Sequence, residues 1–187
     1  AASDVYKRQV KRWCKCPGIL LTVGMLINLL CERIRRTPPL ICRAILPGYE
    51  LRFNKTPGPK KGTGYANVVP AAAKWVEGVL YLLSEEDLAR LDRYEGVPEH
   101  YKRHWLKVWV IEQEKWADAI TYVTVKTNDT LGPPREYLSE IIESAMLIGL
   151  SPEWVNELKR LLENALWIFP SHLFDLLLTP EILMNLR

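Results

Sequence analysis

The hydrophobic pattern begins with an apolar run at residues 19–30. This run is too short to cross a bilayer as a helix, which takes about 20 residues. We interpret it as a buried strand that leads into a short helix at residues 29–36, which Pro38 and Pro39 stop. Because basic residues precede it, the run also resembles a secretory signal, although no small-x-small cleavage site follows. Export or membrane attachment through residues 7–30 therefore remains an alternative to the buried strand.

Alternating apolar positions and β-branched residues predict extended segments along the middle of the chain. The segments are residues 41–53, where Pro47 and Gly48 form a turn between two strands, and residues 65–69, 75–83, 100–112 and 119–126. Residues 55–64, rich in Lys, Pro and Gly, are expected to form a loop whose charges are solvated. The segment at residues 100–112 is predicted to be a long strand that is apolar on much of both faces.

One helix is predicted between the strands, at residues 84–92. Ser84 is a suitable N-cap with Asp87 three residues later, and leucines follow at helical spacing. Gly96 is a suitable C-terminal stop, and Pro98 beyond it prevents the helix from continuing.

Two further helices are predicted after the strands. Pro133 and Pro134 open a helix that runs to Gly149, and Ser151 followed by Pro152 opens the next one. The side chains expected in the core are Leu138, Ile141, Ile142 and Ala145 of the first helix and Trp154, Val155, Leu158, Leu161 and Leu162 of the second.

Together these elements predict an α+β fold, a curved and mostly antiparallel sheet with helices between and after the strands. The chain has 187 residues, and we expect residues 18–163 to form one domain. Residues 1–17 show no amphipathic pattern and are expected to form an ill-ordered leader. Residues 164–187 are an apolar tail whose role the sequence leaves open.

The charge of the chain is concentrated at its start. The net charge is +3 overall, and the first sixteen residues, with five basic side chains and one acidic one, contribute +4, so the remainder carries −1. A basic face for nucleic acid is therefore not predicted beyond the leader.

The cysteines also lie in the first quarter of the chain, at Cys14, Cys16, Cys31 and Cys42. A secreted disulfide framework would spread over the whole fold, so we expect free thiols in a reducing compartment. The spacing of Cys14 and Cys16 is not the usual zinc spacing, and His100, His104 and His172 are not grouped with them. No metal site is expected.

The candidate chemistry lies at residues 91–96, where the central helix ends. Glu95 lies beside Tyr94 and shortly before Tyr101. A carboxylate that is fixed by a short helix and flanked by aromatic rings can have its pKa raised toward neutrality by burial, as an acid/base catalyst requires. The alternative is a solvated carboxylate at a helix end, which is the usual environment of Glu. Asp92, one turn earlier, is expected to be structural.

Several motifs follow one another in order across about residues 25–162. They are Asn28-Leu29-Leu30-x-Glu32-Arg33-Ile34, Cys42-Arg43-Ala44-Ile45-Leu46-x-Gly48-Tyr49-x-Leu51-x-Phe53, Gly64-x-Ala66-Asn67, Val76-x-Gly78-Val79-Leu80-Tyr81, Leu91-Asp92-x-x-Glu95-Gly96, Thr121-Tyr122, Pro134-x-x-Tyr137-Leu138 and Gly149-Leu150-x-Pro152. In this order they resemble the γ-glutamylcyclotransferase-like family. The resemblance implies a compact β-barrel-like fold with a pocket at one end.

The resemblance also implies an activity. Members of this family cyclise a γ-glutamyl amine or peptide to 5-oxoproline and release the amine, without a metal or cofactor. Glu95 matches the catalytic carboxylate, Tyr137 matches a pocket tyrosine, and Tyr101 and Tyr122 match recurrent aromatic positions that we assign to substrate binding. A core aromatic at a helix start remains the alternative for Tyr137. The expected partner is a small γ-glutamyl substrate in the cytoplasm, with no nucleic acid and no membrane.

The substrate loop departs from the family pattern. Relatives carry Tyr-Gly-Ser-Asn before a Leu-Leu-x-x-Arg-Ile run, and the equivalent residues here are Met25, Leu26, Ile27 and Asn28, followed by Leu29. Only Asn28 is retained. In a register shifted by two residues, Val23 and Gly24 would take the place of Tyr-Gly, and in either register the glycine that lets the backbone approach the substrate is displaced or lost. The change is either a reading-frame fault in the recorded sequence or a real loss of the pocket. The leading hypothesis is a cyclotransferase, and the alternative is a catalytically inactive relative that binds a small ligand or a protein.

Overall fold

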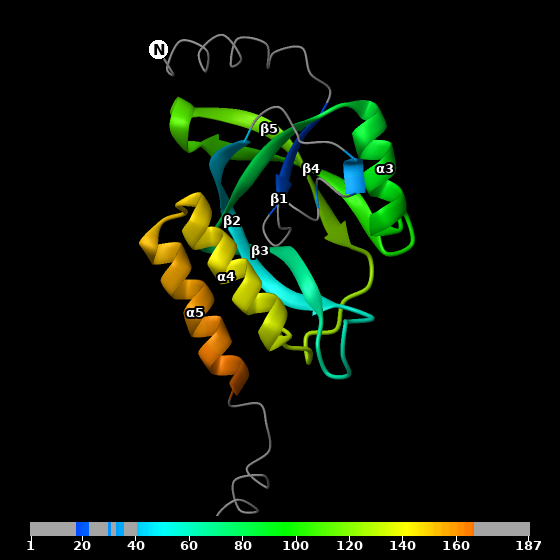
Figure 1. The fold of residues 1–187 in the computed structure, drawn as a ribbon, viewed down its shortest axis with the longest axis vertical. Helices are drawn as coiled ribbons and strands as arrows, with labels where there is room; N and C mark the ends of the chain where they lie inside the picture. Colours follow the sequence, from blue (N-terminus) through cyan, green and yellow to red (C-terminus); the bar gives the residue numbers. More distant parts are fainter. Residues whose placement is uncertain (1–17, 23–29, 31–32, 36–40, 167–187) are drawn as a thin grey trace, which may run out of the picture.

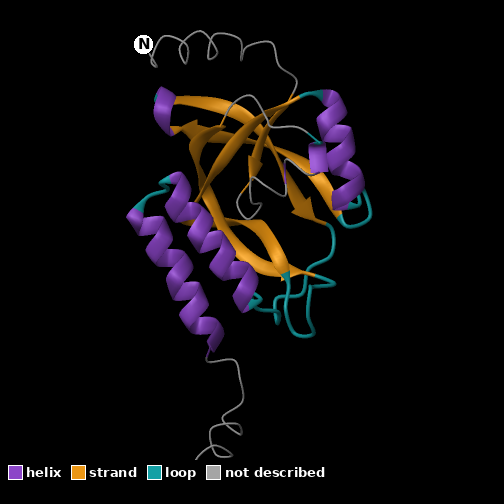
Figure 2. Cartoon of the chain, in the orientation of Figure 1, coloured by secondary structure: helices purple, strands orange, loops and turns teal. Residues whose placement is uncertain are grey.

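The computed structural model describes residues 18–22, 30, 33–35 and 41–166 of the chain. Its elements are, in order, β1 (Gly18–Thr22), β2 (Ile41–Lys55), β3 (Tyr65–Leu83), α3 (Glu85–Glu95), β4 (Tyr101–Val110), a 3-10 turn (Ile111–Gln113), β5 (Lys115–Thr124), α4 (Arg135–Ile148) and α5 (Pro152–Leu166). Helices α4 and α5 lie side by side on one side of a curved sheet, and α3 lies on the opposite side (Figures 1 and 2).

The sheet curls into a closed barrel with the strand order β1-β3-β2-β4-β5. All of its strand pairs are antiparallel except β1 with β5, which close the barrel through the single pair Leu20 and Ile120. Strands β2 and β3 form the longest ladder, from Ile41 opposite Tyr81 to Lys55 opposite Tyr65. The predicted α+β class with a curved, mostly antiparallel sheet is confirmed.

Two predicted breaks between strands are wrong, and β5 (Lys115–Thr124) begins earlier than the predicted segment at 119–126. Residues 41–53 do not form two strands around a turn, because β2 runs through Gly48 with a shift of register between Pro47 and Tyr49. Gly48 has a φ of +76°, so the irregularity is absorbed by a residue without a side chain. Likewise, the strands predicted at 65–69 and 75–83 are one strand, β3. A strand that follows a tightly curved sheet bends at such bulges instead of ending there.

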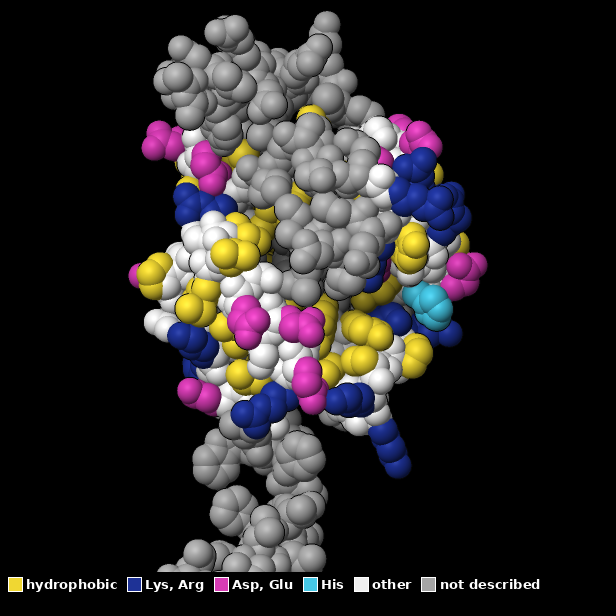
Figure 3. Space-filling model, viewed as in Figure 1, with side chains coloured by type: hydrophobic (Ala, Val, Ile, Leu, Met, Phe, Trp, Pro, Cys, Tyr) yellow, Lys and Arg dark blue, Asp and Glu magenta, His cyan; other side chains and the backbone are white. Residues whose placement is uncertain are grey.

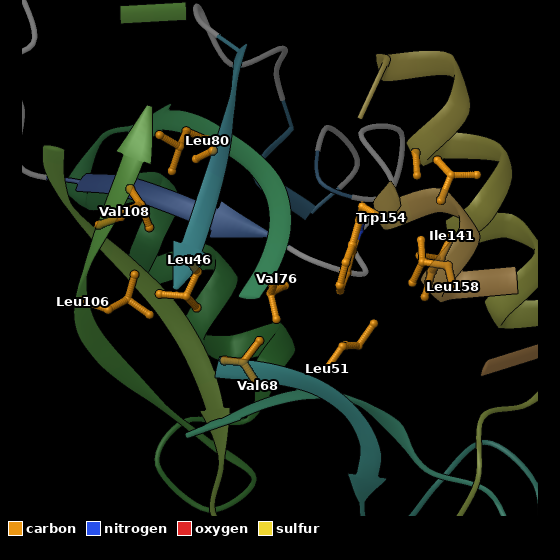
Figure 4. Close-up of a cluster of buried hydrophobic side chains, with 14 of the residues drawn as sticks. Leu46, Leu51, Val68, Val76, Leu80, Leu106, Val108, Ile141, Trp154 and Leu158 are labelled. Atoms are coloured by element: carbon orange, nitrogen blue, oxygen red, sulfur yellow. The ribbon is translucent and has the colours of Figure 1, made fainter. Parts of the chain in front are cut away.

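The larger core lies between the sheet and helices α4 and α5. Figure 4 shows Leu46, Leu51, Val68, Val76, Leu80, Leu106 and Val108 from the strands with Ile141, Trp154 and Leu158 from the helices. The side chains predicted for the core of α4 are all buried, as are Trp154, Val155 and Leu158 of α5. The helical face predicted for both elements is confirmed.

A second, smaller core lies on the other face of β3. Val79, Tyr81 and Leu83 point away from Leu80, because successive side chains of a strand alternate between its faces. They pack with Leu88 and Leu91 of α3, with Ile120 of β5, and with Leu30 and Ile34. Residues 76–81 of β3 are therefore buried without a break, and α3 is held against the outer face of the sheet.

The N-terminal predictions are tested only in part. β1 coincides with the start of the strand predicted at residues 19–30, and Leu30, Arg33 and Ile34 are helical, as predicted for residues 29–36. The leader at residues 1–17, Cys14, Cys16 and Cys31 lie outside the described residues, as does most of the apolar tail, although α5 itself continues to Leu166. Within the described ranges, no helix is both long enough and apolar enough to span a bilayer.

Candidate active site

Helix α3 is bounded by two local signals that the sequence carries. Ser84 and Asp87 form a capping box, in which the Ser84 N–H donates to Asp87 Oδ2 (2.9 Å) and the Asp87 N–H donates to Ser84 Oγ (3.2 Å). At the other end Gly96 adopts the left-handed conformation (φ +64°), and its N–H donates to the carbonyl of Asp92. The predicted helix, its cap and its stop are confirmed, but the helix continues past its predicted end at Asp92, so that Glu95 is the last helical residue and does not lie on the turn beyond it.

Glu95 is largely buried and paired with an arginine. Its side chain is 12% exposed, and the Arg33 Nη1–H donates to Glu95 Oε1 at 2.5 Å. The two residues are far apart in sequence but meet because residues 33–34 pack in the smaller core beside α3. The alternative of a solvated carboxylate at the helix end is therefore wrong for Glu95.

Burial and charge act on Glu95 in opposite directions. Burial raises the pKa of Glu95, while the positive charges of Arg33 and Lys55 and the Arg33 hydrogen bond lower it, and the net effect is a pKa above the usual glutamate range. Burial is therefore the larger effect even though two cations are near. A carboxyl group whose pKa is raised in this way is better suited than a solvated glutamate to both accept and return a proton.

Lys55 also lies close enough to Glu95 for their charges to interact. It was expected in a solvated loop, but it is the last residue of β2 and only 8% exposed. Its Nζ lies 5.2 Å from the centre of the Tyr65 ring and 5.6 Å from that of Tyr101, and burial lowers the pKa of Lys55. The prediction is wrong because the strand continues past Phe53 and turns this side chain inward.

Tyr101 and Tyr137 lie in the same electrostatic environment as Glu95. Burial, followed by the negative charge of Glu95, raises the pKa of Tyr137 to about 12 and raises that of Tyr101 as well. The Tyr137 ring meets Tyr65 edge-on at 6.0 Å and Phe53 at 6.1 Å. Both phenols therefore stay protonated at neutral pH and are available as hydrogen-bond donors beside the carboxylate.

These side chains gather at one end of the barrel. Lys55 ends β2, Tyr65 begins β3 and Tyr101 begins β4, and antiparallel pairing brings these three strand ends together. Tyr137 is in the first turn of α4, and Glu95 ends α3. Five elements thus contribute one side chain each to the same place.

Tyr122 belongs to a neighbouring network. Its hydroxyl donates to Asp92 Oδ1 at 2.7 Å, and Arg103 donates to the same carboxylate through Nε (2.9 Å) and Nη2 (2.7 Å). Burial, then the hydrogen bond to Asp92, raises the pKa of Tyr122. This network ties α3 to β4 and β5 one turn before Glu95, which agrees with the structural role expected for Asp92.

The predicted loop residues Met25, Leu26, Ile27, Asn28 and Leu29 lie outside the described residues, and their assignment to substrate binding stays a prediction. Among the residues that the structure does describe, no three His, Cys, Asp or Glu side chains come together as a candidate metal site.

The sequence missed Arg33, Lys55 and Tyr65 as members of the site. Lys55 had a signal, because Leu51, Phe53 and Lys55 alternate along a strand whose first two members are plainly apolar. Arg33 lies in one of the ordered motifs, but only the fold shows which acid it meets.

Comparison with known proteins agrees with this geometry. A sequence model of the family described as gamma-glutamyl cyclotransferase, AIG2-like, matches residues 24–141, which is more than half of the chain. The Bacillus subtilis (strain 168) protein YkqA, provisionally named a gamma-glutamylcyclotransferase, is 30% identical over 118 residues, which are 63% of this chain. The match spans only 41% of YkqA, so this chain corresponds to less than half of that relative.

Solved structures give the same result at the level of the fold. A gamma-glutamyl cyclotransferase is 26% identical with a TM-score of 0.63, and the human protein loc79017 is 27% identical with the same score. Each similarity covers 76% of this chain and 86% of the solved one. The family match, the closed barrel and the buried Glu95 lead to one assignment: the chain belongs to the gamma-glutamyl cyclotransferase, AIG2-like family.

Proposed function

We propose that this chain is a γ-glutamyl cyclotransferase that converts a γ-glutamyl amine or peptide to 5-oxoproline and a free amine, with Glu95 as general acid/base. The observation that carries the proposal is the buried carboxyl of Glu95, held at the end of α3 by Arg33 and raised in pKa. Its place in a fold whose relatives are named for this activity supports the same conclusion.

The reaction needs only proton transfers and one exchange of C–N bonds. Ionised Glu95 takes a proton from the α-ammonium group of the substrate, and the amine then attacks the substrate's own γ-carbonyl carbon. The new ring C–N bond forms, and Glu95 returns its proton to the departing nitrogen as the original amide C–N bond breaks. The ring nitrogen then gives up its second proton, which the released amine carries away as an ammonium group. No water, metal or cofactor enters this balance.

The surroundings of Glu95 suit these steps. Ring closure is intramolecular, so the main task of the protein is to hold the substrate chain folded back on itself. Tyr101 and Tyr137 are protonated donors that can orient the substrate or stabilise charge on the γ-carbonyl oxygen. A cytoplasmic location is part of the proposal, because cysteines confined to the first quarter of the chain do not suit a secreted disulfide framework.

The test is release of 5-oxoproline from a panel of γ-glutamyl amines and γ-glutamyl dipeptides. The chain is compared with Glu95→Gln, which keeps the shape of the side chain and removes its proton transfer, and with Glu143→Gln, an exposed carboxyl on α4. We expect turnover by the parent chain and by Glu143→Gln, and none by Glu95→Gln. Equal turnover by all three proteins would remove Glu95 from the mechanism.

A second candidate is an inactive relative that binds a small ligand or a protein. It is favoured by one observation, the replacement of three of the four residues of the family loop by Met25, Leu26 and Ile27. The triple variant M25Y/L26G/I27S restores the family sequence at these positions. If this variant releases 5-oxoproline and the parent chain does not, the loop change has abolished the activity of the parent chain. The parent is then better described as an inactive relative that binds a small ligand or a protein.

A further inference from the structure

A second group of charged side chains surrounds a cavity beside α3. The cavity has a volume of about 320 Å³ and is lined by Arg33, Arg35, Arg90, Arg93 and Tyr94. Glu95 is not among its lining residues. Figure 3 shows Lys and Arg side chains gathered over α3 on the right of the view.

Helical spacing explains why three of these residues share a face. Arg90, Arg93 and Tyr94 are three and four residues apart in α3, so they lie next to one another on its surface. The Arg90 Nη1–H donates to the carbonyl of Ile34 (2.9 Å), which joins α3 to the segment that carries Arg33 and Arg35. The four guanidinium groups are thus brought to the cavity by only two pieces of chain.

Among the described residues, the positive charge at the cavity exceeds the negative charge that pairs with it. Arg33 pairs with Glu95, and Arg90 pairs with Glu86 one turn earlier in α3. Across the described parts of the chain, neither Arg35 nor Arg93 forms an ion pair. Two guanidinium charges therefore remain unmatched at one opening.

We propose that this cavity binds the phosphate group of a small phosphorylated compound. A phosphomonoester carries a charge of about −1.5 to −2 at pH 7, which complements the two unmatched arginines. The planar guanidinium group binds phosphate oxygens through two parallel N–H donors, which a lysine cannot do. The volume is at the lower end of the range of small-molecule pockets, so a phosphate with a short organic group fits it.

Tyr94 provides a surface for the organic part of that ligand. Its ring is 61% exposed although it lines the cavity, and the Arg33 guanidinium carbon lies 5.9 Å from the ring centre. An exposed aromatic face beside an arginine cluster favours a ligand with an apolar or aromatic group next to its phosphate. A nucleic acid is the less suitable occupant, because outside the first sixteen residues the chain carries a net charge of −1.

The test is calorimetric titration of the 187-residue chain with phenyl phosphate, inorganic phosphate and phenol at fixed ionic strength. We expect saturable binding of phenyl phosphate, weaker binding of inorganic phosphate and no binding of phenol. Arg93→Gln should weaken phenyl phosphate binding by about tenfold or more, because it removes a charged hydrogen-bond donor. Arg35→Gln, which lies outside α3, should do the same and stands in for Arg93→Gln if that variant fails to fold.

The matched control is Arg160→Gln on α5, which lies on the opposite side of the barrel from α3 (Figure 1). It removes the same charge, and we expect it to change the affinity by less than about twofold. An equal loss in Arg160→Gln, equal binding of phenol and phenyl phosphate, or no saturable binding of either phosphate would each overturn the proposal. Binding is measured without turnover, so this result does not depend on the proposed cyclotransferase activity.

Discussion

At the scale of single residues, the chemistry of this molecule depends on which effect dominates at Glu95. Two cations lie close to its carboxyl, and either one alone would favour the ionised form. The pKa of Glu95 is nevertheless raised, because burial disfavours the charged form more than the attraction of Arg33 and Lys55 favours it. Arg33 therefore sets how far the pKa rises, and it does so through direct contact.

The first prediction concerns the pH profile of turnover. General-base action needs ionised Glu95, so the rate should fall on the acidic side as pH drops through the raised pKa, above the usual glutamate value of about 4.3. Arg33→Gln removes a group that lowers this pKa, so the acidic limb should move to higher pH. The profile of 5-oxoproline release against pH measures it, with Arg160→Gln as a variant of equal charge change. A limb that stays in place or moves to lower pH in Arg33→Gln contradicts the assignment.

The second prediction concerns stability and needs no substrate. A carboxyl whose pKa is raised by folding binds its proton more tightly in the folded state, so its contribution is complete below the unfolded pKa of about 4.3 and is lost as pH rises through the folded value. Glu95→Gln does not titrate. Relative to this variant, the parent chain should therefore become less stable as pH rises from about 4.3 through the raised pKa of Glu95, as urea unfolding of both proteins at each pH would measure. A difference that is constant or grows in favour of the parent would show that the pKa of Glu95 is not raised.

At the scale of elements, α3 is the part that the sequence specifies most completely. The capping box at Ser84 and the left-handed Gly96 are local signals, and both operate in the structure as predicted. Gly96 is also closely surrounded, because a Cβ atom built on it would lie 2.6 Å from His100 Cδ2. The end of the helix, and with it Glu95, is fixed by conformation and by space together.

The third prediction uses this glycine. Gly96→Ala should lower the free energy of unfolding by about 2 kcal/mol or more, since it adds a steric conflict to the strain of a left-handed alanine. Gly48→Ala is the matched control, because Gly48 has a similar φ (+76°) and nothing within 4 Å of the added atom. It should cost only about 1 kcal/mol. Chemical denaturation measures both, and equal losses would mean that the contact with His100 is relieved without strain.

At the scale of the whole molecule, two cores on opposite faces of β3 separate stability from the site. The larger core, with Trp154 of α5, lies between the sheet and α4 and α5. The smaller one, with Leu91 of α3, lies directly beneath the helix that presents Glu95. Damage to either core should destabilise the fold, but only the second should displace the carboxylate.

The fourth prediction follows from this separation. Trp154→Ala and Leu91→Ala each remove a side chain that is at most 3% exposed, and each should lower the free energy of unfolding by about 2–5 kcal/mol. At a temperature where both variants remain folded, Trp154→Ala should retain the parent kcat/KM, and Leu91→Ala should lose at least about tenfold. If the two variants lose activity equally, the cores do not act independently.

The parts of this structure that could be predicted from the sequence are those that depend on local signals. Helices α3, α4 and α5, their caps and their buried faces follow from local periodicity and capping residues. The continuity of β2 and β3 does not, because Gly48 and the small residues around Ala73 resemble turns until the curvature of the sheet is known. For the site, Glu95, Tyr101 and Tyr137 were predictable, whereas the pairing of Glu95 with Arg33, 62 residues away, depends on the fold.

The position of Glu95 as the final residue of a helix capped at both ends has a consequence for how this chain tolerates change. Each residue of an α-helix advances the chain by about 1.5 Å and turns it by about 100°. Deleting or inserting one residue between Asp87 and Asp92 would leave both caps intact and the leucine face broken, and would turn the terminal carboxylate away from Arg33. Substitutions on the exposed side of α3 should therefore be tolerated, whereas a change in the number of its residues should not. Among functional homologues the spacing from the serine cap to the glycine stop should be constant even where the residues between them differ.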